Sequence, residues 1–415
     1  DEISFLYRQL KAFCEAEALQ QSPFLQRSLR LRQLNDRGLD RLYEIERKAA
    51  TKLLDEQAPD QEERYKFELE WATLDNEHFG RRQARTLDDS LAHKLRAMEV
   101  YFLTLLLRES GEALNRQHIL SVDYELPLLS PLLSYLSEER QAYREKPLIE
   151  LYFLICKSLQ TEATDEDYQN LLLGLRRHRS QLSVAVARTM YKYAQNFCIR
   201  QINRGQERYQ QALFDLFQEL LREEVILKEG ELAHTDFKNI VTVGLRVKAL
   251  DWVAGFIDRY HQQVALPFRD NVYAYCQAAL SLEQGQAQAA IRLLQQISHT
   301  DVHYQISARQ LLLKIYYHRE DYEATLYTIS AFRHFVQRNK ELPPTRKTYH
   351  LQFLKLSKAL CLLRERMFAL RREEAEARLQ KFREKLDAAG ELANRSWLED
   401  ECQKLGEELG VGLAI

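Results

Sequence analysis

The stretch YAYCQAALSLEQGQAQAAIRLLQQI, residues 273–297, contains two apolar helical patterns on either side of Gly285. Before the glycine, apolar residues recur every three or four positions, which is the period of an α-helix. After it, a second pattern of the same period begins with small residues such as Ala287 and Ala290. A glycine between two such patterns is typical of a tight turn between paired helices. The stretch therefore predicts a helix, a short turn and a second helix.

Helix pairs of this kind recur along the chain. Five of them follow one another between residues 148 and 337. Corresponding positions in the second helices are Leu171, Ala212, Gly255, Ala290 and Thr325, which are 41, 43, 35 and 35 residues apart. Repeats of this length are typical of α-solenoids, in which each helix pair packs on the next. We therefore expect the quoted stretch to be one unit of a repeat array.

The repeated unit resembles the tetratricopeptide repeat, a family of helix pairs with small residues at fixed positions. Ala278, Gly285 and Ala290 match that pattern, but Ala287 stands where the family places an aromatic residue. Other units match at Gly205, Tyr209, Ala212, Asp321 and Tyr322, and depart from the pattern at Leu313 and Thr325. The resemblance covers roughly residues 148–340. It implies a right-handed superhelical array of antiparallel helix pairs, with a groove for a peptide or helix of a partner protein.

The low glycine and proline contents favour an all-α fold for the whole chain. Its 415 residues include 13 Gly and 8 Pro, too few for the frequent turns of an antiparallel β-protein. The patterns predict one helix before Pro23 and a single long helix from Phe24 to Leu54. The predicted segments are an N-terminal helical region at 1–120, an irregular proline-containing connection at 121–147, the repeats at 148–342, and a long C-terminal helix with a capping tail at 345–415.

The long C-terminal helix is predicted from Lys347 to Ala389. Its apolar positions are spaced by four and three residues, with one step of five across the sequence RREE at 371–374. The positions are Leu356, Leu360, Leu363, Met367, Leu370, Ala375, Leu379, Phe382, Leu386 and Ala389. The pattern is compatible with a helix that caps the last repeat. It is also compatible with a helix whose second half pairs with a partner or with a second copy of the chain.

Charge and cysteine content limit the classes of function. With 59 basic and 61 acidic residues the net charge is −2, which argues against a globally basic nucleic-acid-binding protein. Six cysteines lie far apart in apolar runs, namely Cys14, Cys156, Cys198, Cys276, Cys361 and Cys402. We expect buried, reduced thiols and a cytoplasmic location. The densest apolar stretch, residues 100–107, is far shorter than the about 20 residues of a membrane-spanning helix.

One block departs from the balanced charge. Residues 174–205 carry seven basic residues and no acidic ones. Arginine binds phosphate or carboxylate through two N–H groups, and tyrosine packs on bases or peptides, so the block predicts an anion-binding surface. The alternative is internal neutralisation by the acidic segment 216–231. The candidate binding residues are Arg176, Arg177, Arg179, Arg188, Tyr191, Lys192, Tyr193, Arg200 and Arg204.

The sequence favours a non-catalytic scaffold or adaptor that binds a protein partner, and we expect no cofactor or metal. It contains no Gly-rich phosphate loop, no GxSxG turn and no paired-cysteine zinc spacing. Tyrosines suited to anchor a peptide are Tyr191, Tyr193, Tyr273, Tyr275, Tyr316 and Tyr317, although each also suits a repeat core. The alternatives are a nucleic-acid-associated protein that uses the 174–205 block and, more weakly, an all-helical enzyme.

Overall fold

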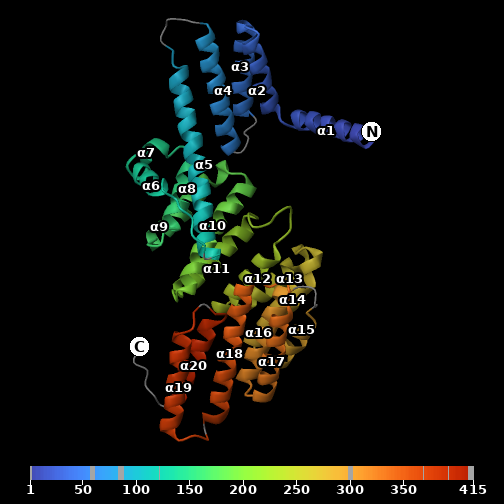
Figure 1. Cartoon of the computed structure of the whole chain (residues 1–415), viewed down its shortest axis with the longest axis vertical. Helices are drawn as coiled ribbons and strands as arrows, with labels where there is room; N and C mark the ends of the chain where they lie inside the picture. Colours follow the sequence, from blue (N-terminus) through green and yellow to red (C-terminus); the bar gives the residue numbers. More distant parts are fainter. Residues whose placement is uncertain are drawn as a thin grey trace. The chain divides into compact units, whose positions relative to one another are not determined.

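The computed structural model describes residues 2–56, 61–82, 88–120, 122–297, 302–367, 369–390 and 392–409. Within these ranges the regular structure is helical and contains no β-strand, which confirms the all-α prediction. The chain divides into two compact units, Asp1–Ile226 and Leu227–Ile415. Figure 1 labels the helices of each unit. None of the described helices is long and apolar enough to cross a membrane.

Unit 1 contains the helices α1 to α11. Their bounds are α1 Glu2–Gln21, α2 Pro23–Asp36, α3 Asp40–Glu56, α4 Gln61–Arg81, α5 Ser90–Leu120, α6 Leu129–Glu138, α7 Arg140–Tyr143, α8 Pro147–Ser158, α9 Asp165–His178, α10 Val184–Asn203 and α11 Arg208–Arg222. The start of α9 shows how the sequence sets these bounds. Thr164 accepts a hydrogen bond from the Asp167 backbone, and Asp167 accepts one from the Thr164 backbone, which is a complete capping box.

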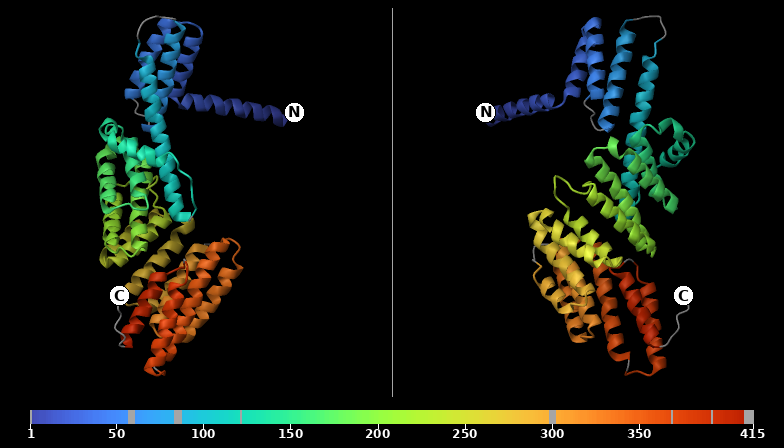
Figure 2. Two further views of the ribbon diagram at one scale, coloured as in Figure 1. Left: turned by 60° about the vertical axis from the view of Figure 1, so that its left-hand side comes forward. Right: turned by 180° about the vertical axis from the view of Figure 1, so that it is seen from behind.

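The helices α2 to α5 lie side by side in alternating directions (Figure 2). The helices α2 and α4 run the same way, because Ser28 accepts a 2.8 Å hydrogen bond from Trp71 and Asn35 lies 3.1 Å from His78. The helix α5 runs the opposite way, because its first residue, Ser90, accepts a 3.1 Å hydrogen bond from Asn76 near the end of α4.

The single helix predicted from Phe24 to Leu54 is wrong. The chain turns at Gly38, where φ is +71° and the backbone N–H of Leu39 donates to the carbonyl of Leu34 at 3.0 Å. Glycine adopts this left-handed conformation without the steric cost that a Cβ adds. The run is therefore two helices, α2 and α3, that pack on each other.

Unit 2 contains the helices α12 to α20. Their bounds are α12 His234–Arg246, α13 Leu250–Tyr260, α14 Leu266–Glu283, α15 Ala287–Gln295, α16 Val302–His318, α17 Tyr322–Arg338, α18 Pro344–Met367, α19 Arg372–Asp387 and α20 Arg395–Glu408. The hairpin that opened the sequence analysis is α14 and α15, with Gly285 at φ +77° in the turn. All ten helices predicted between residues 148 and 337 are present. Their superhelical arrangement and the division into four segments stay predictions.

The prediction of one continuous helix from Lys347 to Ala389 is also wrong. The helix α18 ends at Met367 and α19 begins at Arg372, next to the predicted five-residue step. The apolar side chains of α19 are buried in the core that it shares with α18 and α20, and they are Ala375, Leu379, Phe382 and Leu386. The second half of the predicted apolar stripe therefore lies inside unit 2.

The prediction of buried thiols holds for five of the six cysteines, and Cys14 on α1 is exposed.

We predict opposite effects of alanine at two glycines of unit 2. Gly285→Ala places a Cβ at positive φ and destabilises the fold by about 1 kcal/mol, which lowers the melting temperature by a few degrees. Gly255→Ala is the control, because Gly255 lies inside α13, where an added Cβ would meet no neighbouring side chain or helix within 4 Å. This substitution raises helix propensity by up to about 1 kcal/mol. Calorimetry of both full-length variants measures the change in melting temperature relative to the wild type. Equal changes in the two variants would contradict the turn geometry at Gly285.

Candidate functional site

The structure distributes the predicted basic block over α9, α10 and the short 3₁₀ turn Arg179–Gln181. Its first three arginines pair with carboxylates. Arg176 donates two hydrogen bonds to Glu219, at 3.0 and 2.6 Å. Arg177 lies 3.0 Å from Glu150, which also bonds to His178, and Arg179 lies 3.9 Å from Glu223. Since Glu219 and Glu223 belong to the acidic segment 216–231, these contacts are those of internal neutralisation.

The other predicted residues differ in their contacts and exposure. Arg188 donates to the carbonyl of Val225 at 2.9 Å. Arg200 donates to the carbonyl of Ser158 at 2.7 Å, and desolvation lowers its pKa to about 10. Tyr191 and Tyr193 are buried, whereas Lys192 and Arg204 are exposed. Anion binding by these nine residues stays a prediction.

A second set of cations lies in unit 2, on one side of α12, α14 and α16. The helix α14 packs against both α12 and α16. Nevertheless Lys238 on α12 donates a 2.7 Å hydrogen bond to Ser307 on α16, and Tyr304 on α16 donates to the carbonyl of His234 at 3.2 Å. Packed helix axes are about 8–10 Å apart. Two helices that flank a third can therefore contact each other only through side chains that reach across the same side of the middle helix.

Lys238, Arg246 and Lys314 are the cations of this side, which we call the cationic face. The ammonium of Lys238 lies 4.9 Å from the ring centre of Tyr275 on α14. The ammonium of Lys314 lies 5.5 Å from the ring centre of Trp397. Arg246 is exposed at the end of α12. Desolvation and the charge of Arg246 lower the pKa of Lys314 to about 8, so the two cations lie close enough to repel each other.

Lys314 is held by the segment that begins α20. Its ammonium donates a 2.7 Å hydrogen bond to Asn394, which caps α20 in a left-handed conformation with φ 51°. Trp397, one turn into α20, supplies the ring beside Lys314 and donates to His318 at 3.4 Å. The position of Lys314 therefore depends on how α20 docks onto α16.

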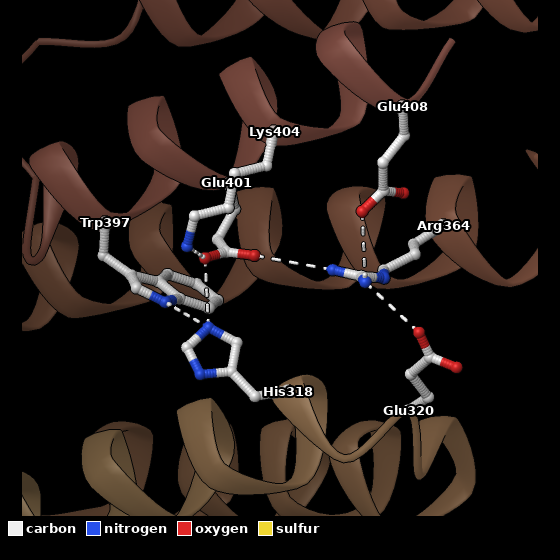
Figure 3. A network of polar contacts seen from close by, with 7 residues as sticks. All are labelled: His318, Glu320, Arg364, Trp397, Glu401, Lys404 and Glu408. Atoms are coloured by element: carbon white, nitrogen blue, oxygen red, sulfur yellow. Dashed lines mark hydrogen bonds and ion pairs between the residues drawn. The ribbon is translucent and has the colours of Figure 1, made fainter. Parts of the chain in front are cut away.

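A buried carboxylate, Glu401, fixes α20 in that position (Figure 3). Its side chain is 1% exposed and lies 3.0 Å from His318, 2.7 Å from Lys404 and 3.5 Å from Arg364. His318 belongs to α16 and Arg364 to α18, so one carboxylate joins three helices. Desolvation opposes its charge, but the hydrogen bonds from His318 and Lys404 prevail and hold its pKa at about 2. Figure 3 also shows that Arg364 links on to two further carboxylates, Glu320 and Glu408.

Glu401→Gln is expected to destabilise unit 2 by about 3 kcal/mol at neutral pH, because it leaves the surrounding cations without their buried counter-charge. The folded pKa of Glu401 lies below its ordinary value of 4.5, so its stabilisation is full above that pH. It is lost as the pH falls from 4.5 toward about 2. Urea unfolding of the wild type and the variant across this range measures the difference.

The matched control for Glu401→Gln is Glu399→Gln, which removes a half-exposed carboxylate from an intrahelical pair with Arg395. Such pairs contribute about 0.5 kcal/mol or less. A difference between wild type and Glu401→Gln that stayed constant down to about pH 2 would contradict the charged network.

The cationic face was missed by the sequence analysis for a geometric reason. Lys238, Arg246 and Lys314 form no cluster along the chain, because they come from α12 and α16, which are separated by α13, α14 and α15. Tyr275 was among the tyrosines singled out, and it is partly exposed on this face, whereas Tyr317 is fully buried. Comparing cations at the outward positions of the first helix of each repeat would have found Lys238 and Lys314.

Comparisons with known proteins do not assign the chain to a family. No protein-family model, no curated protein and no solved structure matches it significantly.

Proposed function

We propose that this protein is a non-catalytic interaction scaffold that binds an acidic peptide segment of a partner protein on the cationic face. The observation that carries the proposal is the gathering of Lys238, Arg246 and Lys314 on neighbouring helices. Among the described residues, no ion pair within 4.0 Å joins Arg246 or Lys314 to a carboxylate. A carboxylate of the peptide placed between Arg246 and Lys314 would relieve the repulsion between these two cations. That gain in free energy contributes to the affinity for the peptide.

An acidic peptide fits this face better than a nucleic acid. Proteins bind single-stranded nucleic acids by stacking bases on exposed aromatic rings beside a basic groove. Here the rings of Tyr275 and Trp397 each have a lysine ammonium over them, at 4.9 and 5.5 Å. These lysines obstruct base stacking, while their ammonium groups suit the side-chain carboxylates of a peptide. In unit 1, the ion pairs of Arg176, Arg177 and Arg179 weaken the case for nucleic acid further.

The proposal agrees with the expected repeat architecture. In a right-handed array of tetratricopeptide-like pairs, the first helix of each pair lines the inner side, and α12, α14 and α16 are first helices. An extended peptide laid across them would meet Lys238 and Arg246 on α12 and Lys314 on α16. We also infer a cytoplasmic location, which the unpaired cysteines favour.

Binding is tested with a fluorescent peptide of alternating Glu and Leu, and with its Gln-for-Glu counterpart. We expect the wild type to bind only the acidic peptide, and Arg246→Gln or Lys314→Met to weaken binding at least about tenfold, which is 1.4 kcal/mol. Lys248→Gln is the control, since Lys248 is exposed in the same unit and pairs with Glu283. Preference for a single-stranded oligonucleotide over the acidic peptide in fluorescence anisotropy would contradict the proposal.

The affinity for the acidic peptide is expected to fall as the pH rises. With a pKa of about 8, Lys314 is mostly charged at neutral pH and mostly neutral about one unit above that value. The anionic peptide binds the charged form, so the affinity decreases through about pH 8. Lys314→Arg keeps the charge and removes the pH dependence, whereas Lys314→Met lowers the affinity at every pH. An unchanged pH profile in Lys314→Arg would exclude Lys314 as the titrating group.

A further inference from the structure

Large exposed apolar side chains concentrate in the first helices of unit 1. Among the described residues, those on α1 are Phe5, Leu6, Tyr7, Leu10 and Phe13, and those on α5 are Leu91, Leu95, Met98 and Phe102. Isolated exposed apolar residues are normal on a protein surface, but a continuous row on one helix face indicates an interaction site. Two such rows lie on helices of the same unit.

The row on α5 has the spacing of a coiled-coil seam. Leu91, Leu95, Met98 and Phe102 follow steps of four, three and four residues, and each is 44–56% exposed. Other apolar side chains of α5, such as Val100, are buried where the helix packs on α4 and α8. The seam is thus a second apolar face, and its spacing suits one further helix.

The helix α1 has a matching row. Leu6, Leu10 and Phe13 follow steps of four and three residues, and each is 61–65% exposed. The main neighbour of α1 is α2, which it meets at their junction. In Figure 2, α1 extends from the start of α2 without covering α5. Because helix formation in water depends mainly on burial of an apolar face, a helix exposed in this way needs a partner surface.

We propose that α1 of one copy docks on the α5 seam of a second copy, so that two chains exchange their N-terminal helices. An antiparallel alignment sets Leu6 against Phe102, Leu10 against Met98 and Phe13 against Leu95. These three layers bury the apolar row of α1 and three of the four residues in the α5 row, and Leu91 lies at the level of Glu17. Reciprocal exchange between two chains gives a closed, two-fold pair.

Charge selects the antiparallel alignment. It brings Glu17, in the acidic second half of α1, to the level of Leu91, three residues from the basic residue Lys94 near the start of α5. The parallel alignment instead sets Lys11 at the level of Arg96. Opposed like charges cost free energy, so they disfavour the parallel alignment.

The antiparallel alignment requires a second copy because of the connection between α1 and α2. That connection is the single residue Ser22. The helix α5 runs opposite to α2, so an α1 antiparallel to its own α5 would run in the same direction as α2. A one-residue connection then leaves α1 as an extension of α2, beyond its N-terminal end and away from the seam. Only the α5 of another chain can accept α1 in this orientation.

Crosslinking through the exposed Cys14 tests the pairing in the full-length protein. In the antiparallel alignment Cys14 and Ala92 flank the seam on the same side and at nearly the same level. We expect Ala92→Cys, treated with a short bis-maleimide, to give a covalent pair of chains in a denaturing gel. His93→Cys is the control, because that position is exposed on α5 but turned away from the seam. Cys14→Ser combined with Ala92→Cys should give no covalent pair.

Sedimentation equilibrium gives an independent measurement. The wild type is expected at twice the chain mass, and Leu10→Ser or Leu95→Ser at the mass of one chain. Leu173→Ser removes a side chain of similar exposure from α9 and should leave the pair intact. A monomeric wild type, or a crosslink within a single chain, would overturn the proposal. These variants keep the cationic face, so their peptide affinity separates failure of this inference from failure of the proposed function.

Discussion

The buried carboxylate of Glu401 is the interaction on which the geometry of the cationic face in unit 2 depends. It is 1% exposed, and it remains charged because His318, Arg364 and Lys404 surround it. A buried ion pair is seldom a large net source of stability, since desolvation offsets most of the attraction. Its effect here is on geometry, because the charges fit together only when α16, α18 and α20 meet in one arrangement. That arrangement places Asn394 and Trp397 against Lys314.

The helices could be predicted from the sequence because their signals are local. The three-to-four-residue period located α14 and α15, and Gly285 located their turn. Where the predictions were wrong, the apolar period of the sequence continued across the end of one helix into the next helix. Gly38 supplies the left-handed residue that separates α2 from α3, and the pattern around it gave no other sign of an ending. After Met367 the apolar rhythm resumes at Ala375, because α19 turns back to bury its apolar face in the same core as α18.

The candidate site could not be predicted in the same way, because it is formed by contacts between distant helices. The basic block at 174–205 was conspicuous in the sequence, yet Arg176 and Arg179 pair with Glu219 and Glu223, about one repeat further along the chain. Lys238 and Lys314 were inconspicuous because neither lies in a run of basic residues along the chain. Only packing shows that α12 and α16 turn toward each other and bring these cations to one face.

The cationic face and the α5 seam would together make a scaffold with two binding sites per assembly. If two chains pair through α1 and α5, a partner with two acidic segments could engage both copies, and its apparent affinity would exceed that of either site. The two surfaces use different physics. Apolar burial holds the copies together, and charge selects the ligand, so salt should weaken peptide binding without separating the chains.

The most direct test of the central claim is calorimetric titration of the acidic peptide at about pH 8 in two buffers of different ionisation enthalpy, which reports proton uptake on binding. A carboxylate beside Lys314 raises the pKa of that lysine, so binding should take up a fraction of a proton per peptide. The uptake should disappear in Lys314→Arg and near pH 6. Tight binding with no proton uptake in the wild type, or with the same uptake in Lys314→Arg, would contradict the account.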